Sequence, residues 1–283
     1  MEPRDFNPIE NELRIFNPWP SAGTDVMQPS KDVAFSVRGQ LGADIRRLAI
    51  AYNGSWKSAL LAALCKRELG GENVILLVFV SRLMTAQDLM VARKTAAGLE
   101  LPLQTVGMES GLPPEVAQNN QLRCYNCKKN MLARLQAVAG TYGFKTLADA
   151  LCADDATSKP MSFQAAEETG VVHPLGSFHA ADLKQFSKTI MLPPGLGRLQ
   201  GCLAVRINEN LPITPERLAQ VENTERQIAQ LGLPDCLVRH FGQYAQIEVP
   251  EDDFDTANFL YEKILRLATS NGFLSISIQK RPR

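Results

Sequence analysis

The fold follows from one stretch of sequence, residues 47–58, which reads Arg47-Leu48-Ala49-Ile50-Ala51-Tyr52-Asn53-Gly54-Ser55-Trp56-Lys57-Ser58. The apolar run 47–52 predicts a buried strand, and the apolar spacing from Trp56 to Leu69 predicts a helix that stops at a pair of glycines. Between them, Asn53-Gly54-Ser55 predicts a tight turn. Such a turn brings backbone NH groups and the positive end of a helix to one edge of a parallel sheet. The stretch therefore predicts a phosphate site.

The same alternation continues along the chain. Strands are predicted at 74–80, 101–106 and 145–151, with helices at about 85–97 and 120–142 between them. Uninterrupted apolar strands between helices predict a parallel sheet that is covered on both faces. Residues 152–194 predict short helices among Pro and Gly breaks, and residues 201–207 predict a further strand. The first part of the chain is therefore expected to be an α/β domain.

The pattern changes after Thr214. A helix is predicted at 214–231, and further elements are expected as strands 237–241 and 244–249, a helix at about 254–270 and a strand at 273–278. This order is typical of a small α+β domain. We expect three parts, namely an irregular extension over 1–30, the α/β domain over 31–207 and the α+β domain over 208–283.

Composition narrows the class of protein. The 283 residues include 30 basic and 30 acidic side chains, so no overall charge draws the chain to nucleic acid. No apolar run reaches the ~20 residues that a membrane span needs, and the first residues lack the order of a secretory signal. Six cysteines are too few for a disulfide scaffold of this size. We expect a cytoplasmic protein with reduced thiols and no membrane contact.

Two of the cysteines form a CxxC pair, Arg123-Cys124-Tyr125-Asn126-Cys127-Lys128. Basic neighbours and a place at the start of a helix are expected to lower the pKa of both thiols, which favours binding of a soft metal or an iron-sulfur cluster. A third ligand must come from elsewhere. The spacing by itself also fits a redox pair, half a zinc site or two buried small residues. Cys65 and Cys236 are predicted to lie in the core, and Cys152 near the phosphate site.

The turn after the first strand resembles the Ser-Gly-Gly-x-Asp-Ser loop of the PP-loop ATP pyrophosphatases. Gly54 and Ser58 fit this pattern, whereas Asn53, Ser55 and Lys57 stand in place of its first serine, second glycine and aspartate. The resemblance implies a PP-loop domain of the adenine-nucleotide-hydrolase type. In it, Lys57 would be either a substitute phosphate ligand or a sign of lost chemistry.

Further blocks occur in the order found in the LarE-type sulfur transferases, from about residue 31 to the end. They are Arg-Cys-Tyr-x-Cys-Lys at 123–128, Cys-Leu-Ala-x-Arg-Ile at 202–207, Pro212-Ile213-Thr214, Val238-Arg239-His240 and Ile247-Glu248-Val249-Pro250. These enzymes adenylylate a carboxylate of a nicotinic-acid-derived mononucleotide and then install sulfur on it, during synthesis of a nickel-pincer cofactor.

The resemblance implies roles for particular residues. Members with three cysteines hold a four-iron four-sulfur cluster with one iron open for a sulfide, and the matching ligands here are Cys124, Cys127 and Cys202, which would also carry the catalysis. ATP or AMP, with Mg²⁺, would be bound by Asn53, Gly54, Ser55, Lys57, Ser58, Asp149 and Lys159. Arg206 and Arg239 would hold the phosphate of a mononucleotide or AMP. A homo-oligomer is expected.

Departures from the family pattern fall in the ATP half. Segment 149–155 keeps the three aspartates of the family pattern, but three of the residues between them differ from it. Lys159-Pro160 stands where the family has Arg-Pro-Gly. An alternative is therefore a homologue without ATP turnover that acts as a cluster-binding sulfur carrier or as the partner of an intact paralogue. A third is a tRNA-thiolating PP-loop enzyme, for which a more basic chain is expected.

Overall fold

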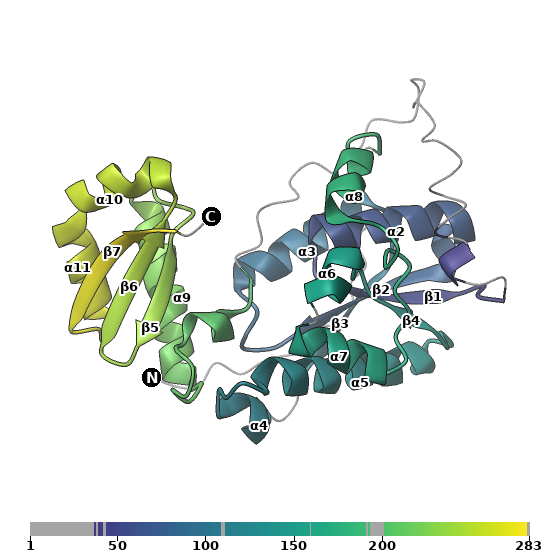
Figure 1. Ribbon diagram of the computed structural model, residues 1–283, viewed down its shortest axis with the longest axis horizontal. Helices are drawn as coiled ribbons and strands as arrows, with labels where there is room; N and C mark the ends of the chain where they lie inside the picture. Colours follow the sequence, from purple (N-terminus) through teal and green to yellow (C-terminus); the bar gives the residue numbers. More distant parts are fainter. Residues whose placement is uncertain are drawn as a thin grey trace.

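The computed structural model describes residues 37, 39–41, 44–108, 111–158, 160–190, 192 and 201–281. The extension predicted over 1–30, and with it Lys159, lies outside these residues. The described chain forms two sheets that lie side by side, each with its own helices (Figure 1). No helix in these ranges is both long enough and apolar enough to span a bilayer.

The first sheet has four strands in the order β3-β2-β1-β4, all parallel. Its strands are β1 (Leu48–Tyr52), β2 (Val74–Val80), β3 (Leu103–Gly107) and β4 (Leu147–Ala148). The predicted parallel α/β sheet is thus confirmed. Its last strand is shorter than the expected 145–151, since the amide of Asp149 bonds instead to the carbonyl of Val172.

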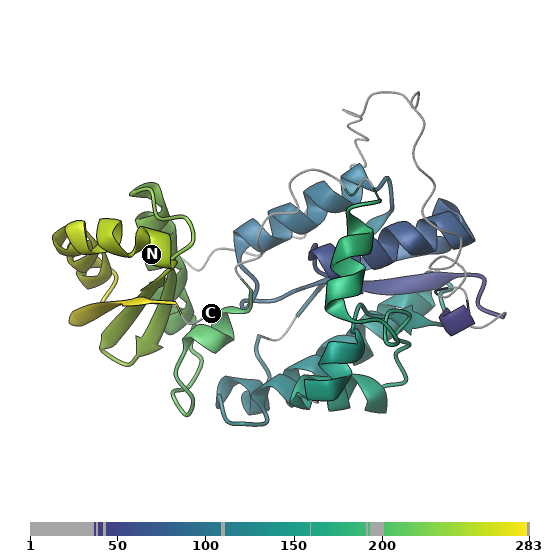
Figure 2. The ribbon, with the colours of Figure 1, turned by 45° about the horizontal axis from the view of Figure 1, so that its top comes forward.

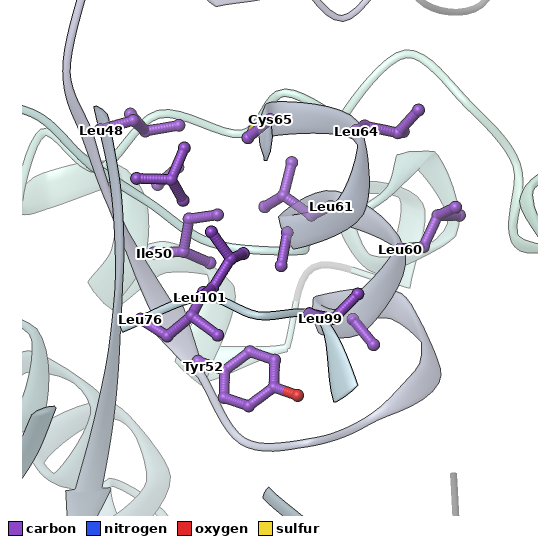
Figure 3. Packing of buried hydrophobic residues seen from close by; sticks show 14 of the residues in the cluster. Leu48, Ile50, Tyr52, Leu60, Leu61, Leu64, Cys65, Leu76, Leu99 and Leu101 are labelled. Carbon is purple, nitrogen blue, oxygen red and sulfur yellow. The ribbon is translucent and has the colours of Figure 1, made fainter. Parts of the chain in front are cut away.

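Helices cover both faces of this sheet, as expected from its uninterrupted apolar strands (Figures 1 and 2). One core cluster combines alternate residues of β1 with α2 (Trp56–Leu69) and α3 (Ala86–Gly98), and Figure 3 shows part of it. Ala49 and Ala51 point the other way and pack with α5 (Arg123–Thr141) and α7 (Met161–Glu168). Cys65 is completely buried in the first cluster, as predicted.

The second sheet has three strands in the order β5-β6-β7. Strands β5 (Leu237–Phe241) and β6 (Tyr244–Val249) are antiparallel, and β7 (Ser275–Lys280) runs parallel to β6. Helices α9 (Pro215–Gln230), α10 (Phe254–Phe259) and α11 (Tyr261–Ser270) pack with it, and Cys236 is buried as predicted. Leu83, Val116 and Leu203 belong to the same core, so this cluster takes residues from the expected 31–207 range. The predicted domain boundaries themselves stay a prediction.

Two predicted elements are wrong. Residues 201–207 do not form a strand, because Leu203–Arg206 is a 3₁₀ helix, η2, with Cys202 at its N-cap. The predicted helix 254–270 is interrupted at Leu260, which separates α10 from α11. The remaining elements are short, namely α4 (Pro114–Ala117), α6 (Ala153–Ser158), α8 (Ala180–Ser187), η1 (Gly71–Asn73) and η3 (Glu251–Asp253).

Candidate functional site

The turn between β1 and α2 has the geometry of a phosphate loop. Gly54 has φ +78°, and a Cβ atom there would lie 2.7 Å from the backbone Cα of Ala92 in α3, so the position requires glycine. Ser55 is the N-cap of α2, and its hydroxyl accepts a hydrogen bond from the amide of Ser58 at 3.3 Å. The Ser58 hydroxyl in turn donates to Asn53 Oδ1 at 3.0 Å. Three predicted loop residues therefore fix one another.

A cavity of about 270 Å³ opens at this end of the sheet. Five of the predicted nucleotide-binding residues line it, namely Asn53, Ser55, Lys57, Ser58 and Asp149. Its remaining lining residues are Ala51, Tyr52, Val78, Phe79, Met84, Lys128, Met131, Leu135, Ala150 and Leu151. The structure thus places most of the predicted loop around one cavity, at the carboxyl ends of parallel strands where ligands of such folds bind.

Lys57 lines this cavity and forms an ion pair with Asp155. Its Nζ lies 2.7 Å from Asp155 Oδ2 and 3.6 Å from Cys152 Sγ. Burial by itself would lower the pKa of Lys57, but the hydrogen bond and charge of Asp155 outweigh it and raise that pKa. Lys57 is therefore a cation whose position is fixed by an ion pair. Cys152, predicted near this site, is in contact with Lys57 and is buried.

Asp149 is the most buried charged group of the cavity, with 4% of its side chain exposed. His173 Nδ1 lies 2.7 Å from Asp149 Oδ1, and Lys128 Nζ lies 3.2 Å from Asp149 Oδ2. Burial would raise the pKa of Asp149, but His173 and Lys128 together lower it. Lys128 directly follows Cys127, so α5 connects the cavity to the cysteine pair. Sequence reasoning missed Lys128, although its place beside CxxC was visible.

The three predicted cysteines lie near one another at the end of the first domain. Cys124 and Cys127 are on the first turns of α5, and Cys202 caps η2. Both Cys202 and Cys124 act electrostatically on the Cys127 thiol and raise its pKa. Cys124 and Cys202 are exposed and Cys127 is half-buried. Among the described residues, no three His, Cys, Asp or Glu side chains converge on the position of a single metal ion.

The predicted lowering of the thiol pKa values is wrong for Cys127. Arg123 and Lys128 do lower the pKa of this thiol, but burial is the larger effect and raises it to about 11. The pKa of Cys202 is also raised, with desolvation by the surrounding protein as the first cause, even though the residue as a whole is exposed. Without a bound metal, Cys127 is therefore held as a neutral thiol at pH 7.

Asn119 ties the Cys202 segment to the cysteine helix. Its buried side-chain amide donates to the carbonyls of Ile207, Asn208 and Leu211 at 3.3, 2.8 and 2.8 Å. Its own carbonyl oxygen accepts a hydrogen bond from Arg123. Asn119 also has φ +57°, a left-handed conformation that asparagine tolerates better than most residues. No sequence motif predicted this residue, because its partners are far away along the chain.

Three arginines hold η2 by its carbonyl groups. Arg123 donates to the carbonyl of Ala204 at 3.2 Å, Arg206 to that of Cys202 at 3.1 Å, and Arg239 to that of Val205 at 2.8 Å. These carbonyls are thus bonded within the turn and to arginines, since the amides of Val205 and Ile207 also donate to Cys202 and Ala204, and in the described part of the chain no neighbouring strand pairs with them. The two predicted phosphate ligands, Arg206 and Arg239, thus also hold the turn that carries Cys202.

Both of these arginines pair with glutamates of the second domain. Arg206 Nε lies 3.1 Å from Glu225 Oε1 with each side chain 2% exposed, and Arg239 Nε lies 3.0 Å from Glu248 Oε2. A cavity of about 450 Å³ lies beside the turn. It is lined by Asn120, Gln121, Arg123, Val205, Arg206, Ile207, Asn208, Glu209, Arg239 and Phe241. Three arginines and Glu209 line it, and two of these arginines are already paired with glutamates.

Comparison with known proteins gives two relatives. No protein-family model matches the chain. It is 29% identical over 215 residues to an uncharacterized protein of Synechocystis sp., covering 75% of this chain and 80% of that protein. It is 24% identical over 238 residues to the pyridinium-3,5-bisthiocarboxylic acid mononucleotide synthase of Lactiplantibacillus plantarum, covering 83% of this chain and 86% of that protein. The chain is thus a distant relative of a LarE-type synthase, in agreement with the motif resemblance.

Proposed function

We propose that this chain is a cytoplasmic LarE-like sulfur transferase. In this proposal it activates a carboxylate of a pyridine mononucleotide with ATP and exchanges the activated oxygen for sulfur from a four-iron four-sulfur cluster. The name of the L. plantarum relative describes a pyridinium mononucleotide with two thiocarboxylic acids, which is the product of such chemistry. The observation that carries the proposal is that Cys124, Cys127 and Cys202 lie near one another. Helix α5 carries two of them and also places Lys128 in the phosphate cavity.

The thiols suit a cluster better than a single ion. They come from two elements and influence one another electrostatically, yet they do not converge on one ion position among the described residues. A cubane has its iron atoms at separate corners and binds one thiolate at each, so its ligands stand further apart. Cys124, Cys127 and Cys202 would hold such a cluster, which when bound would supply the sulfur. Raised thiol pKa values mean that protons leave when metal binds.

In this proposal each of the two cavities binds one of the substrates. In the first, Asn53, Ser55, Ser58 and Lys57 would bind the phosphates of ATP at the N-terminus of α2. In the second, Arg239 and its neighbours would bind the phosphate or carboxylate of the mononucleotide. Transfer of AMP to the carboxylate releases pyrophosphate and makes AMP the leaving group that a sulfur nucleophile displaces.

Nucleic acid is not a partner in this proposal, and the protein acts as a homo-oligomer.

Anaerobic reconstitution with iron and sulfide tests the cysteine site. The wild type is expected to turn brown and to retain about four irons per chain. Cys124→Ala, Cys127→Ala and Cys202→Ala should each lose this absorbance, whereas Cys236→Ala, which removes a buried cysteine elsewhere, should keep it. A colourless wild type with one zinc per chain, or full absorbance in Cys202→Ala, contradicts the cluster.

A second candidate is a cluster-binding sulfur carrier, or partner subunit of an intact paralogue, without ATP turnover. The observation that favours it is the ion pair between Lys57, which lines the phosphate cavity, and Asp155. Release of pyrophosphate from ATP in the presence of a pyridine mononucleotide distinguishes the two functions. Release supports the transferase, and no release from a protein that keeps its cluster supports the subunit. Light scattering on the same sample gives the oligomeric state.

A further inference from the structure

The cavity at the end of β1 contains two lysines, and each faces one aspartate. Lys57 Nζ lies 2.7 Å from Asp155 Oδ2, and Lys128 Nζ lies 3.2 Å from Asp149 Oδ2. Carboxylates are the protein ligands that Mg²⁺ prefers, and nucleotide sites commonly use one or two of them. The state of these aspartates therefore decides whether a nucleotide binds here together with that ion.

All three aspartates of segment 149–155 already have cationic or NH partners. Besides the two lysine pairs, Asp154 Oδ1 lies 3.1 Å from His179 Nδ1, and Asp154 Oδ2 accepts a hydrogen bond from the amide of Ala180. Asp155 Oδ2 also accepts from the amide of Cys152 at 2.9 Å. The donor set does not fit the divalent ion that nucleotide chemistry implies.

Lys57 brings hydrogen-bond donors to the cavity rather than a net charge. Its charge cancels that of Asp155, so the pair is neutral, whereas a carboxylate that holds a doubly charged cation has a net charge of plus one. The ammonium has three N–H donors, so its bond to Asp155 leaves donors for a ligand. The Lys57 side chain keeps 26% of its area exposed and lines the cavity, where a phosphate can reach it. The N-terminus of α2 adds partial positive charge at the same place.

We infer that this cavity binds the phosphate of a nucleotide directly through Lys57, with Lys128 as the second cation, and without a divalent metal ion. The inference rests on the proposed function, because that proposal makes this cavity the nucleotide site. It goes beyond it by stating which side chains contact the phosphate and that no divalent ion takes part.

Calorimetric titration of the full-length protein with AMP and with ATP, each in excess EDTA or excess MgCl₂, tests the inference. We expect AMP to bind in EDTA with a Kd within about threefold of that in MgCl₂, a difference smaller than one tenfold step in affinity. Binding of both nucleotides only with MgCl₂ overturns the inference and leaves the proposed function standing. Failure of both nucleotides to bind under either condition overturns the nucleotide half of the proposed function as well.

Two variants locate the effect. Lys57→Gln should weaken AMP binding in EDTA by about tenfold or more, because a charge-assisted bond to phosphate is lost. Lys57→Asp should also bind weakly in EDTA and regain affinity when MgCl₂ is added. Lys66→Gln is the matched control, since Lys66 is on the same helix but pairs with Glu100 at 2.9 Å and does not line the cavity. Wild-type AMP affinity in a folded Lys57→Gln variant overturns the inference.

Discussion

The phosphate cavity and the cysteine site use their basic residues in opposite ways. In the cavity, Lys57 and Lys128 line the wall, and each pairs with the carboxylate of an aspartate. At the cysteine site, three arginines bind backbone carbonyls and hold the turn that carries Cys202. The first arrangement pairs side-chain charges at a cavity wall, whereas the second fixes the position of a turn. A basic residue near a site therefore does not by itself indicate an anion ligand.

The difference follows from where each site lies. The phosphate loop is local, because Asn53, Ser55 and Ser58 bond to one another within a few residues. The cysteine site is assembled from helix α5, which packs on the first sheet, from η2 and from strand β5 of the second sheet. A site built across elements needs side chains that bridge them, and a planar guanidinium with several donors does this well.

Removal of the Arg206 side chain should have the largest effect. Arg206→Met leaves Glu225 buried without its cation, and we expect a loss of about 3–5 kcal/mol in the free energy of unfolding. Burial already raises the pKa of Glu225, so the loss should grow as pH rises above the unfolded value of about 4.3, where the carboxylate must be charged. Urea unfolding at two pH values measures both effects.

Arg239→Met is the matched control, because Arg239 also bonds to an η2 carbonyl and a glutamate but is 32% exposed. Its free energy of unfolding should fall by about 1 kcal/mol, as expected for ion pairs that are exposed to water. The double variant Arg206→Met/Glu225→Leu should be more stable than Arg206→Met alone. Equal losses for the two arginine variants would break the comparison between buried and exposed cations.

A methyl group at Gly54 tests how firmly the phosphate loop is fixed. Gly54→Ala should lose about 2–3 kcal/mol, since the new Cβ overlaps the backbone of α3 and φ is positive. Gly111 has the same φ of +78° but open space around it, so Gly111→Ala should lose only about 1 kcal/mol. Thermal unfolding of both variants gives the difference. Similar losses would show that α3 moves to accommodate the loop.

The effect expected at the Cys127 thiol is smaller and concerns its rate of alkylation. Burial raises its pKa to about 11, so in metal-free protein at pH 8 it should react with iodoacetamide about tenfold more slowly than an ordinary thiol. The lower thiolate fraction outweighs the greater reactivity of a more basic thiolate. The rate should rise with pH toward 11. Mass spectrometry of labelled peptides follows each cysteine, and rapid labelling of Cys127 at pH 8 contradicts the prediction.

Low pH should modestly lower the free energy of unfolding through the ion pairs of the phosphate cavity. The pKa values of Asp149 and Asp155 are lowered: burial would raise each, but His173 and Lys128 act on Asp149, and Lys57 on Asp155, in the opposite direction and prevail. Their contribution to stability is therefore present above the unfolded pKa of about 3.9 and is lost as pH falls below it. Stability measured from pH 6 to pH 3 should fall more in the wild type than in Asp155→Asn. An equal fall would show that the pair does not stabilise the fold.

Most of the first sheet could be predicted from the sequence. The strands at 48–52 and 74–80 and helix α2 follow from apolar spacing, the Asn53-Gly54-Ser55 turn and paired glycines, which are local signals. The strand predicted at 201–207 failed for the opposite reason. Its apolar pattern is compatible with a strand, but arginines from α5 and β5 take up the carbonyls, and no local pattern reveals such distant donors.

The sequence by itself determined the first two strands, helix α2 and the turn at Gly54, because the pattern that predicts each of them lies within a few residues. Only the tertiary structure decided which charges meet. Lys57 and Asp155 are 98 residues apart, and Arg123 and Ala204 are 81 apart. Contacts at such separations depend on how the sheets and helices pack, since many side chains along the chain have the right chemistry and the fold brings only a few of them together.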